Sequence, residues 1–235
     1  MDDKLLAAQA FLFFGAGFET SASATSYTLH MFAQHQEAQE RARAEVLATL
    51  ARHNGVITYE AVKEMTYLTW ALKESMRLVP PVGNVNRKVL RSCYLPGVGQ
   101  LDPGIRILVS ACAFHRDPRY FPEPDEFRPE RFNPDNLTPG AKLAYIPFGV
   151  GPRACIGEQM AMLVSVSGLA AVLAGARVAP ARGLAPAPPP ALAPGAVGGR
   201  RITACLPCLT RSKNLNNNVE PGSSMKGGVV LSPYK

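Results

Sequence analysis

Apolar residues recur at helical spacing over residues 3–52, but their density changes along this range. The stretch LLAAQAFLFFGAGF at residues 5–18 is almost wholly apolar, whereas QHQEAQERARAEVLATL at residues 34–50 is charged and amphipathic. This pattern predicts a helix over residues 3–52 whose apolar part is buried. Gly15 and Gly17 interrupt the apolar part, and two glycines in a helix indicate a kink or a close approach.

A second helical region follows. HNGVITYEAVKEM at residues 53–65 predicts a turn and then a helix that Thr58 caps, with Ala61 at its third position. The helix is expected to continue through YLTWALKESMRL at residues 67–78. It should stop at the proline pair of residues 80–81, because the residue before a proline disfavours helical geometry.

The rest of the chain is expected to hold strands, irregular segments and one more helix. Residues 82–110 show a strand-like pattern, with turns at LPGVGQ and DPG. Residues 115–140 are rich in proline and charge, which predicts an ordered but irregular meander, and a helix should run from about Cys155 to Ala176. Beyond it, PARGLAPAPPPALAPGAVGG predicts extended or irregular chain, GGRRITACLPCLTR a last hairpin, and residues 213–235 a disordered tail.

The composition is that of a soluble globular protein. With 235 residues, of which 47% are apolar, the chain can bury a core as one large domain or two small ones. The net charge of +7 could favour an acidic partner, an anionic membrane or nucleic acid, but the basic residues are scattered and lack interleaved aromatics. A solvated basic surface without nucleic-acid binding is therefore expected. The apolar stretch is short and contains Gln9, and the MDDK start is acidic, so neither a membrane anchor nor a signal peptide is expected.

The five cysteines show no disulfide spacing, which favours a reducing compartment. Cys93 and Cys112 lie among apolar residues and are expected to be small core residues. Cys205 and Cys208 have the C-x-x-C spacing of a zinc or redox pair, but a structural zinc site needs four ligands and no second pair is near. Two free cysteines in a final strand are the favoured interpretation.

Cys155 differs, because it lies in PFGVGPRACIGEQMAM, a glycine-rich loop directly before an apolar helix. Glycines 149, 151 and 157 allow a tight turn and a close approach to a flat ligand. Such a loop can aim backbone N–H groups at one sulfur, and a helix beginning at Cys155 adds its positive end, so both favour a thiolate. Arg153 can pair with a carboxylate of the ligand. A charged, shielded thiolate would be a soft metal ligand, and the alternative is a buried, inert cysteine.

FGVGPRACIG matches the pattern Phe-x-x-Gly-x-Arg-x-Cys-x-Gly and resembles the cysteine loop of the cytochrome P450 family, the haem-thiolate monooxygenases. The resemblance implies that Cys155 is the axial ligand of the iron of haem b. It also implies a group of residues around the cofactor, namely Phe148, Gly149, Gly151, Arg153 and Gly157.

KESMR contains Glu74 and Arg77, which lie three residues apart and so share one face of a helix. Alone, this pattern would indicate an ordinary solvated ion pair. It is followed by PERF, with Arg131, in the order found in the family. The resemblance implies that these three residues form a buried network that braces the cysteine loop.

GAGFETSASA is similar to the oxygen-binding helix of the family, although alone it would be an ordinary helix. The resemblance implies that Ala16 and Gly17 make room for dioxygen, that Thr20 hydrogen-bonds the bound oxygen, and that Glu19 delivers protons. In PPVGNVNRK, Arg87 falls where the family has an arginine for a haem propionate. Val82, Gly83 and Val85 would then line the substrate side.

The resemblance covers residues 1 to about 212. Within the family, the chain is similar to the eukaryotic microsomal branch, and its stretch AQAFLFFGAGFETSAS is especially like insect members. It implies a mainly α fold with a small β component, the incomplete C-terminal portion of the cytochrome P450 fold. The implied activity inserts one oxygen atom of O2 into an apolar small molecule, with electrons from NADPH through NADPH-cytochrome P450 reductase. The full-length family would lie at the cytosolic face of the endoplasmic reticulum membrane. Because family members are much longer, the alternative is a truncated, non-catalytic haem-binding fragment.

Overall fold

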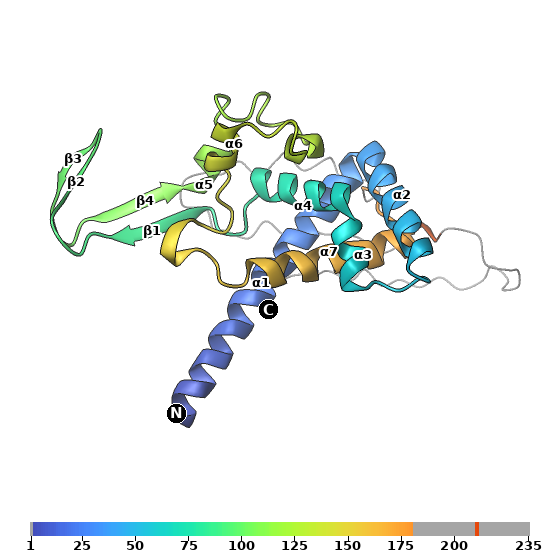
Figure 1. The fold of residues 1–235 in the computed structure, drawn as a ribbon, viewed down its shortest axis with the longest axis horizontal. Coiled ribbons are helices and arrows are strands. Elements are labelled where there is room, and N and C mark those ends of the chain that lie inside the picture. Colours follow the sequence, from blue (N-terminus) through green and yellow to red (C-terminus); the bar gives the residue numbers. More distant parts are fainter. Residues whose placement is uncertain (1, 181–209, 212–235) are drawn as a thin grey trace, which may run out of the picture.

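The structure, a computed structural model, describes residues 2–180 and 210–211. The described chain is mainly helical with three small antiparallel sheets (Figure 1). The helices are α1 (Asp3–Gln34), α2 (Gln36–Arg52), α3 (Tyr59–Glu64), α4 (Thr66–Leu78), α5 (Ala111–His115), α6 (Pro139–Ala144) and α7 (Glu158–Gly175), with 3-10 turns η1 (Pro129–Phe132) and η2 (Gly151–Arg153). The strands are β1 (Asn84–Lys88), β2 (Cys93–Leu95), β3 (Gly99–Leu101), β4 (Arg106–Ser110), β5 (Ala176–Arg177) and β6 (Thr210–Arg211).

The core forms where the second half of α1 packs with α2, α4 and α7 (Figure 1). Apolar side chains one helical turn apart, such as Leu68 with Leu72 on α4 and Leu169 with Leu173 on α7, are fully buried there. Each such side chain stabilises the fold by about 1.5–3 kcal/mol relative to an exposed position. This core fixes α4, which carries Glu74 and Arg77, and α7, which directly follows the loop of Cys155.

The predicted single helix over residues 3–52 was wrong at His35, where the backbone leaves helical geometry and α2 begins. The buried side chain of Gln39 stabilises this turn by hydrogen bonds to nearby Phe32 and to distant Val178. Its Nε2 donates to the Phe32 carbonyl at 3.0 Å and to the Val178 carbonyl at 2.7 Å, and its Oε1 accepts from the Val178 amide at 2.7 Å. The turn lets both helices pack against α4 and α7.

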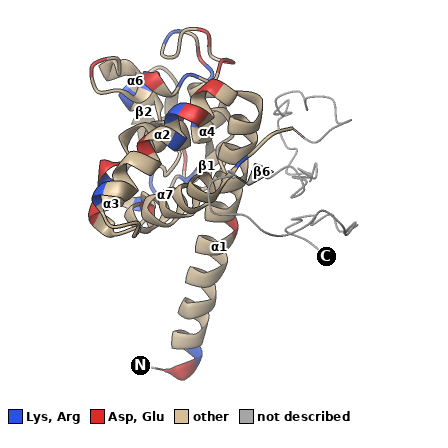
Figure 2. Cartoon of the chain, turned by 90° about the vertical axis from the view of Figure 1, so that its right-hand side faces the viewer, with Lys and Arg blue, Asp and Glu red and all other residues tan. Residues whose placement is uncertain are grey.

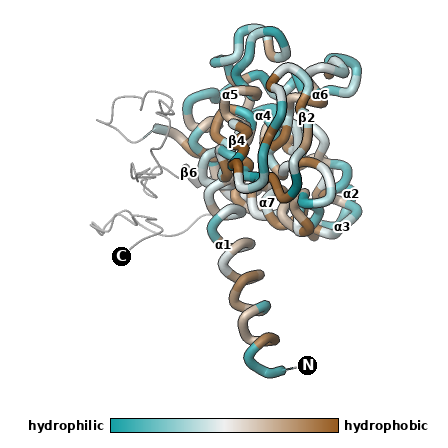
Figure 3. Tube along the Cα trace, turned by 90° about the vertical axis from the view of Figure 1, so that its left-hand side faces the viewer, coloured by the Kyte–Doolittle hydropathy of each residue, from teal (hydrophilic) through white to brown (hydrophobic). Residues whose placement is uncertain are grey.

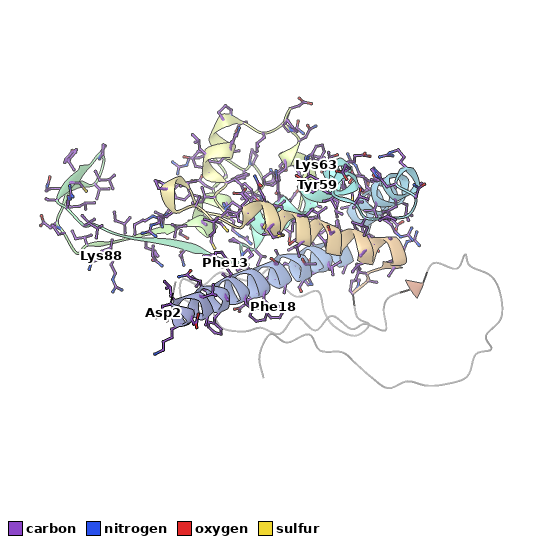
Figure 4. All side chains as sticks on the ribbon, turned by 60° about the horizontal axis from the view of Figure 1, so that its bottom comes forward. Asp2, Phe13, Phe18, Tyr59, Lys63 and Lys88 are labelled. Atoms are coloured by element: carbon purple, nitrogen blue, oxygen red, sulfur yellow. The ribbon has the colours of Figure 1, made fainter. Side chains whose placement is uncertain are left out.

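The first half of α1 is exposed, so the prediction that residues 5–18 are buried was wrong. Phe11, Phe14 and Phe18 are 78%, 70% and 63% exposed, and Figure 3 shows this apolar stretch projecting from the body. Phe13 and Phe18 extend from α1 in Figure 4. The helix continues through Gly15 and Gly17, and no atom of the described chain outside the helix backbone lies within 4 Å of a Cβ built there, so the predicted close approach was wrong.

Among the described residues, two helices, α1 and α7, are long and apolar enough to cross a membrane by length and composition alone. Core helices of soluble proteins pass the same test, and the α7 stretch is partly buried. Figure 2 shows charged residues scattered over the helical body, with both signs interspersed, in agreement with the scattered basic residues of the sequence.

Thr58 caps α3 as predicted, because its Oγ1 accepts from the Ala61 amide at 3.1 Å. The predicted continuous helix beyond it breaks at Met65, and α4 starts afresh without a cap from its own segment. Instead, Glu45 of α2 supplies the cap. Its carboxylate accepts from the amides of Tyr67 and Leu68, both at 2.9 Å. The break is tolerated because a neighbouring helix satisfies the orphan donors of α4.

Replacing Glu45 with alanine is expected to lower the free energy of unfolding by about 1–2 kcal/mol, because two amides at the start of α4 lose a charged acceptor. Urea unfolding followed by circular dichroism measures this loss. Glu60→Ala is the matched control, since Glu60 is exposed in the first turn of α3 and makes no hydrogen bond within the described chain. Equal losses for the two variants would contradict the cap.

The strands form as the pattern predicts, with β1 paired to β4 and β2 to β3 in antiparallel register. The two hairpins project from the helical body (Figure 1). The prediction that Cys93 lies in the core was wrong, because β2 belongs to a two-stranded hairpin and Cys93 is exposed there. Cys112 is half-buried, and burial raises the pKa of its thiol. A Cβ at Gly83 would lie 2.9 Å from the Cys112 sulfur, so glycine allows this close approach.

The meander of residues 115–140 is irregular and ordered, as predicted, with η1 inside it and α6 beginning at its end. The predicted final hairpin lies mostly outside the described residues, and β6 pairs with β5. The expectations for the proline-rich segment beyond residue 180, for Cys205 and Cys208, and for the tail of residues 213–235 also lie outside the described residues.

Candidate functional site

The cysteine loop is a tight turn held by its own backbone. Gly149 and Gly151 have φ values of 72° and 76°, a left-handed conformation that other residues adopt only with strain. The Gly149 amide donates to the Ile146 carbonyl at 3.1 Å, and the Cys155 amide donates to the Phe148 carbonyl at 2.8 Å. The chain therefore folds back on itself between Phe148 and Cys155. Phe148 packs against the helical core and anchors the turn.

Cys155 is a free, exposed thiol. Two predicted features of its surroundings were wrong. Helix α7 begins at Glu158 with Gly157 as its cap, so Cys155 precedes the helix. Within the described residues no backbone N–H donates to the sulfur, and the Cys155 amide itself donates to the Phe148 carbonyl at 2.8 Å. A Cβ at Gly157 would lie 3.9 Å from the sulfur, so the backbone of Gly157 passes close to it.

Exposed apolar side chains occur before and after Cys155 in the sequence. Val150 and Ile156 are 59% and 85% exposed on either side of it in the loop. Met160 and Val164, four residues apart, extend the apolar surface along one face of α7 at 63% and 51% exposure. A soft sulfur ligand within an apolar surface suits a flat apolar group that carries a metal. Within residues 2–180, no group of three or more His, Cys, Asp or Glu side chains could hold a metal ion.

Glu74 and Arg77 form a buried ion pair on α4, and both side chains are fully inaccessible. Arg77 Nε donates to Glu74 Oε2 at 2.7 Å, and Arg77 Nη2 donates to Oε1 at 2.9 Å. Glu74 Oε1 also accepts from Arg131 Nε at 3.3 Å and from the Arg128 amide at 2.9 Å. The structure thus brings together the three charged residues that the sequence singled out.

The same guanidinium groups bind carbonyls of the meander. Arg77 donates to the carbonyls of His115, Pro124 and Glu126 at 2.8, 2.7 and 3.1 Å. Arg131 Nη2 donates to the Glu123 carbonyl at 2.7 Å, and burial lowers the pKa of its guanidinium. The network therefore joins α4 to α5 and to the meander, which leads to the cysteine loop.

His115 links this network to the loop and was not identified from the sequence. It is fully buried, and its Nε2 accepts from the Ile146 amide at 2.9 Å. Beside it, the Tyr145 hydroxyl donates to the Lys73 carbonyl of α4 at 3.0 Å. The local sequence shows only a histidine at the end of a short helix. Such a residue is usually accessible to solvent, so the pattern does not predict a buried role.

The residues predicted on α1 remain near the surface. Thr20 Oγ1 donates to the Ala16 carbonyl at 2.7 Å, so its proton is engaged by the helix and its lone pairs are free to accept. Gly17 and Glu19 are exposed, and Glu19 makes no hydrogen bond within the described chain. No hydrogen bond or ion pair connects these residues to Cys155 in residues 2–180.

The two predicted cofactor arginines are also exposed. Arg87 lies within β1, and its Nη1 donates to the carbonyl of neighbouring Asn86 at 2.9 Å. Arg153 lies in η2, and its side chain makes no hydrogen bond in the described chain. Both guanidinium groups are accessible to an anionic group. On β1 and before it, Val85 is half-buried and Val82 is 50% exposed.

Comparisons with known proteins give one consistent family. The sequence model of the cytochrome P450 family matches residues 1–193. The chain is 41% identical over 180 residues to "Cytochrome P450 6a2" of Drosophila melanogaster, covering 76% of this chain and 36% of that protein. It is 41% identical over 156 residues to "Cytochrome P450 6l1" of Blattella germanica, covering 66% and 31%, and 40% identical over 169 residues to "Cytochrome P450 9e2" of the same species, covering 70% and 31%. The chain spans about a third of the length of these relatives.

Proposed function

Because the chain belongs to the cytochrome P450 family, we propose that it is the C-terminal, haem-binding portion of a haem-thiolate monooxygenase. Cys155 is the axial ligand of haem b in this proposal. The observation that carries it is the exposed Cys155 thiol on a glycine turn, in a segment whose apolar side chains Val150, Ile156 and Met160 are also exposed. A single thiolate within an apolar surface fits a macrocycle that supplies the other iron ligands itself.

Haem bound through a thiolate activates dioxygen, because the thiolate donates electron density that favours O–O cleavage. The residues of this chain bind and orient. The accessible guanidinium groups of Arg153 and Arg87 pair with the propionates, and Phe148, Gly149, Gly151 and Gly157 shape the loop around the ligand sulfur. The buried set of Glu74, Arg77 and Arg131 braces that loop through the meander.

The oxygen side of the site belongs to α1 in this proposal. The Thr20 hydroxyl would lie on this side of the site, where its lone pairs could accept a hydrogen bond from a proton donor, since its own proton is donated to the Ala16 carbonyl at 2.7 Å. Exposed Glu19 provides a titratable group for proton delivery, and Gly17 leaves space beside the helix. An apolar small molecule is the substrate class, with Val82, Gly83 and Val85 on its side of the pocket.

The electrons come from NADPH through NADPH-cytochrome P450 reductase, and O2 is the second substrate, as the family assignment suggests. The full-length protein would then lie at the cytosolic face of the endoplasmic reticulum membrane. The alternative is a non-catalytic, haem-binding fragment of such an enzyme. Two observations support it, namely the coverage of about a third of the relatives and the exposed apolar side chains of α1, such as Phe11 and Phe14.

The carbon-monoxide difference spectrum of the purified, haem-reconstituted and reduced 235-residue chain tests this proposal. A strongly red-shifted Soret band is expected, because a thiolate ligand shifts the absorption in the carbon-monoxide complex. Turnover of apolar substrates with added reductase then separates the enzyme from the non-catalytic fragment. Haem binding without a red-shifted band would contradict thiolate ligation by this chain.

A further inference from the structure

His115 lies between α4 and the segment that enters the cysteine loop. Its ring is fully buried and stacks on the Tyr145 ring, with 5.2 Å between the centroids. Its carbonyl accepts from Arg77 Nη1 at 2.8 Å, whereas its ring Nε2 contacts the Ile146 amide at 2.9 Å. One residue therefore contacts the buried charge network through its backbone and the approach to the loop through its side chain.

The contact with Ile146 defines the protonation state of the ring. A backbone N–H can only donate, so Nε2 must hold a lone pair and the ring proton must lie on Nδ1. Burial lowers the pKa of His115 to about 4, which keeps the ring neutral at physiological pH. The ring thus acts as a fixed acceptor for the one amide at the entrance of the loop.

The other ring nitrogen has no partner within the described chain. Nδ1 is buried and makes no hydrogen bond of normal geometry, although the backbone of Arg77 and Met76 lies near enough to oppose the lowering of the pKa. These residues belong to the last turn of α4, where helix carbonyls have no partner within the helix. The ring is therefore held between the end of α4 and the Ile146 amide.

From Ile146 the connection to Cys155 is a short series of backbone hydrogen bonds. The Ile146 carbonyl accepts from the Gly149 amide at 3.1 Å, and the Phe148 carbonyl accepts from the Cys155 amide at 2.8 Å. Because these hydrogen bonds link Ile146 to both ends of the turn, we expect a shift of Ile146 to displace the turn and Cys155 with it.

We propose that His115 is a positioning residue, whose Nε2 fixes the Ile146 amide and thereby sets where the loop holds Cys155 relative to α4. The proposal rests on the proposed function only in taking Cys155 as the haem ligand. The hydrogen bond and its effect on the loop are properties of the chain without haem.

The test compares His115→Gln with His115→Met in the full chain. The two replacements have nearly the same size and shape, but only glutamine keeps an acceptor for the Ile146 amide. Hydrogen exchange measured by NMR should be about ten- to a hundredfold faster at Ile146 in the methionine variant than in the glutamine variant. The Gly149 and Cys155 amides should also exchange faster in the methionine variant than in the glutamine variant. The core amide of Val46 on α2 should exchange at the same rate in both variants.

Haem-loaded protein gives a second readout, in which the methionine variant loses part of the red-shifted carbon-monoxide band and the glutamine variant retains it. Equal exchange at Ile146 in the two variants would overturn the inference. The inference would also be overturned if the ¹⁵N chemical shifts of the wild-type His115 ring placed its proton on Nε2. This measurement uses the wild-type chain and needs no variant to fold. A wild-type chain without thiolate-ligated haem would contradict the proposed function, while the amide comparison would still decide the role of His115.

Discussion

The Cys155→Ala variant of the chain is expected to lose the red-shifted carbon-monoxide band completely while keeping its fold. The loss is total because the only proposed protein ligand of the iron is removed. The fold survives because the side chain is exposed and accepts no hydrogen bond within the described chain, and surface replacements of this kind change stability by about 0.5 kcal/mol or less. The measurement is the difference spectrum beside far-ultraviolet circular dichroism.

Cys93→Ala is the matched control for this prediction. Cys93 is also exposed, but it lies in β2, on a hairpin that projects from the helical body. Its replacement should leave the spectrum unchanged. A persistent thiolate spectrum in Cys155→Ala, or its loss in Cys93→Ala, would contradict the assignment of the ligand.

The Arg77→Leu variant should be the most destabilised single variant of the buried network, by about 3–5 kcal/mol, because it leaves the Glu74 carboxylate buried without its partner. Three meander carbonyls lose their donor as well. Since domains are stable by only about 5–15 kcal/mol, the variant should be largely unfolded in modest urea. Urea unfolding followed by circular dichroism measures the change.

Two further variants make this prediction specific. Glu130→Gln removes the exposed ion pair with Arg41 and should cost about 0–1 kcal/mol. The double variant Glu74→Met with Arg77→Met should not recover the free energy of unfolding that Arg77→Leu loses. Replacing an isolated buried ion pair with apolar residues often leaves stability unchanged or raises it. Here the carbonyls of His115, Pro124 and Glu126 would still be without donors. Recovery of stability in the double variant would show that the pair does not support the meander.

The sequence predicted the parts of this fold that short-range geometry controls. The three-residue spacing of Glu74 and Arg77 put them on one face of a helix, and Thr58 was recognised as a cap from its place before an apolar pattern. The glycines at 149 and 151 indicated a tight turn, which their left-handed φ values confirm. In each case the interacting groups lie within one or two turns of chain, so the local sequence contains all that is needed.

The sequence did not reveal how distant segments meet. It placed residues 5–18 in the core because they are apolar, yet no element of the described chain covers them. It missed the helix breaks at His35 and Met65, because Gln39 ties the first break to distant Val178 and Glu45 of α2 caps the second. It also could not tell that a guanidinium at Arg77 would bind three carbonyls 38 to 49 residues away.

The sequence by itself therefore determined the family, the turn that carries Cys155 and the charge pair on one face of α4. These depend on residue types at fixed short spacings. Only the tertiary structure decided that His115 connects that pair to the loop, that the Cys155 sulfur receives no backbone hydrogen bond in the described chain, and that α7 begins three residues beyond it. The physical reason is that a hydrogen bond between distant segments requires both to be placed within about 3 Å, and packing of the whole core sets that distance.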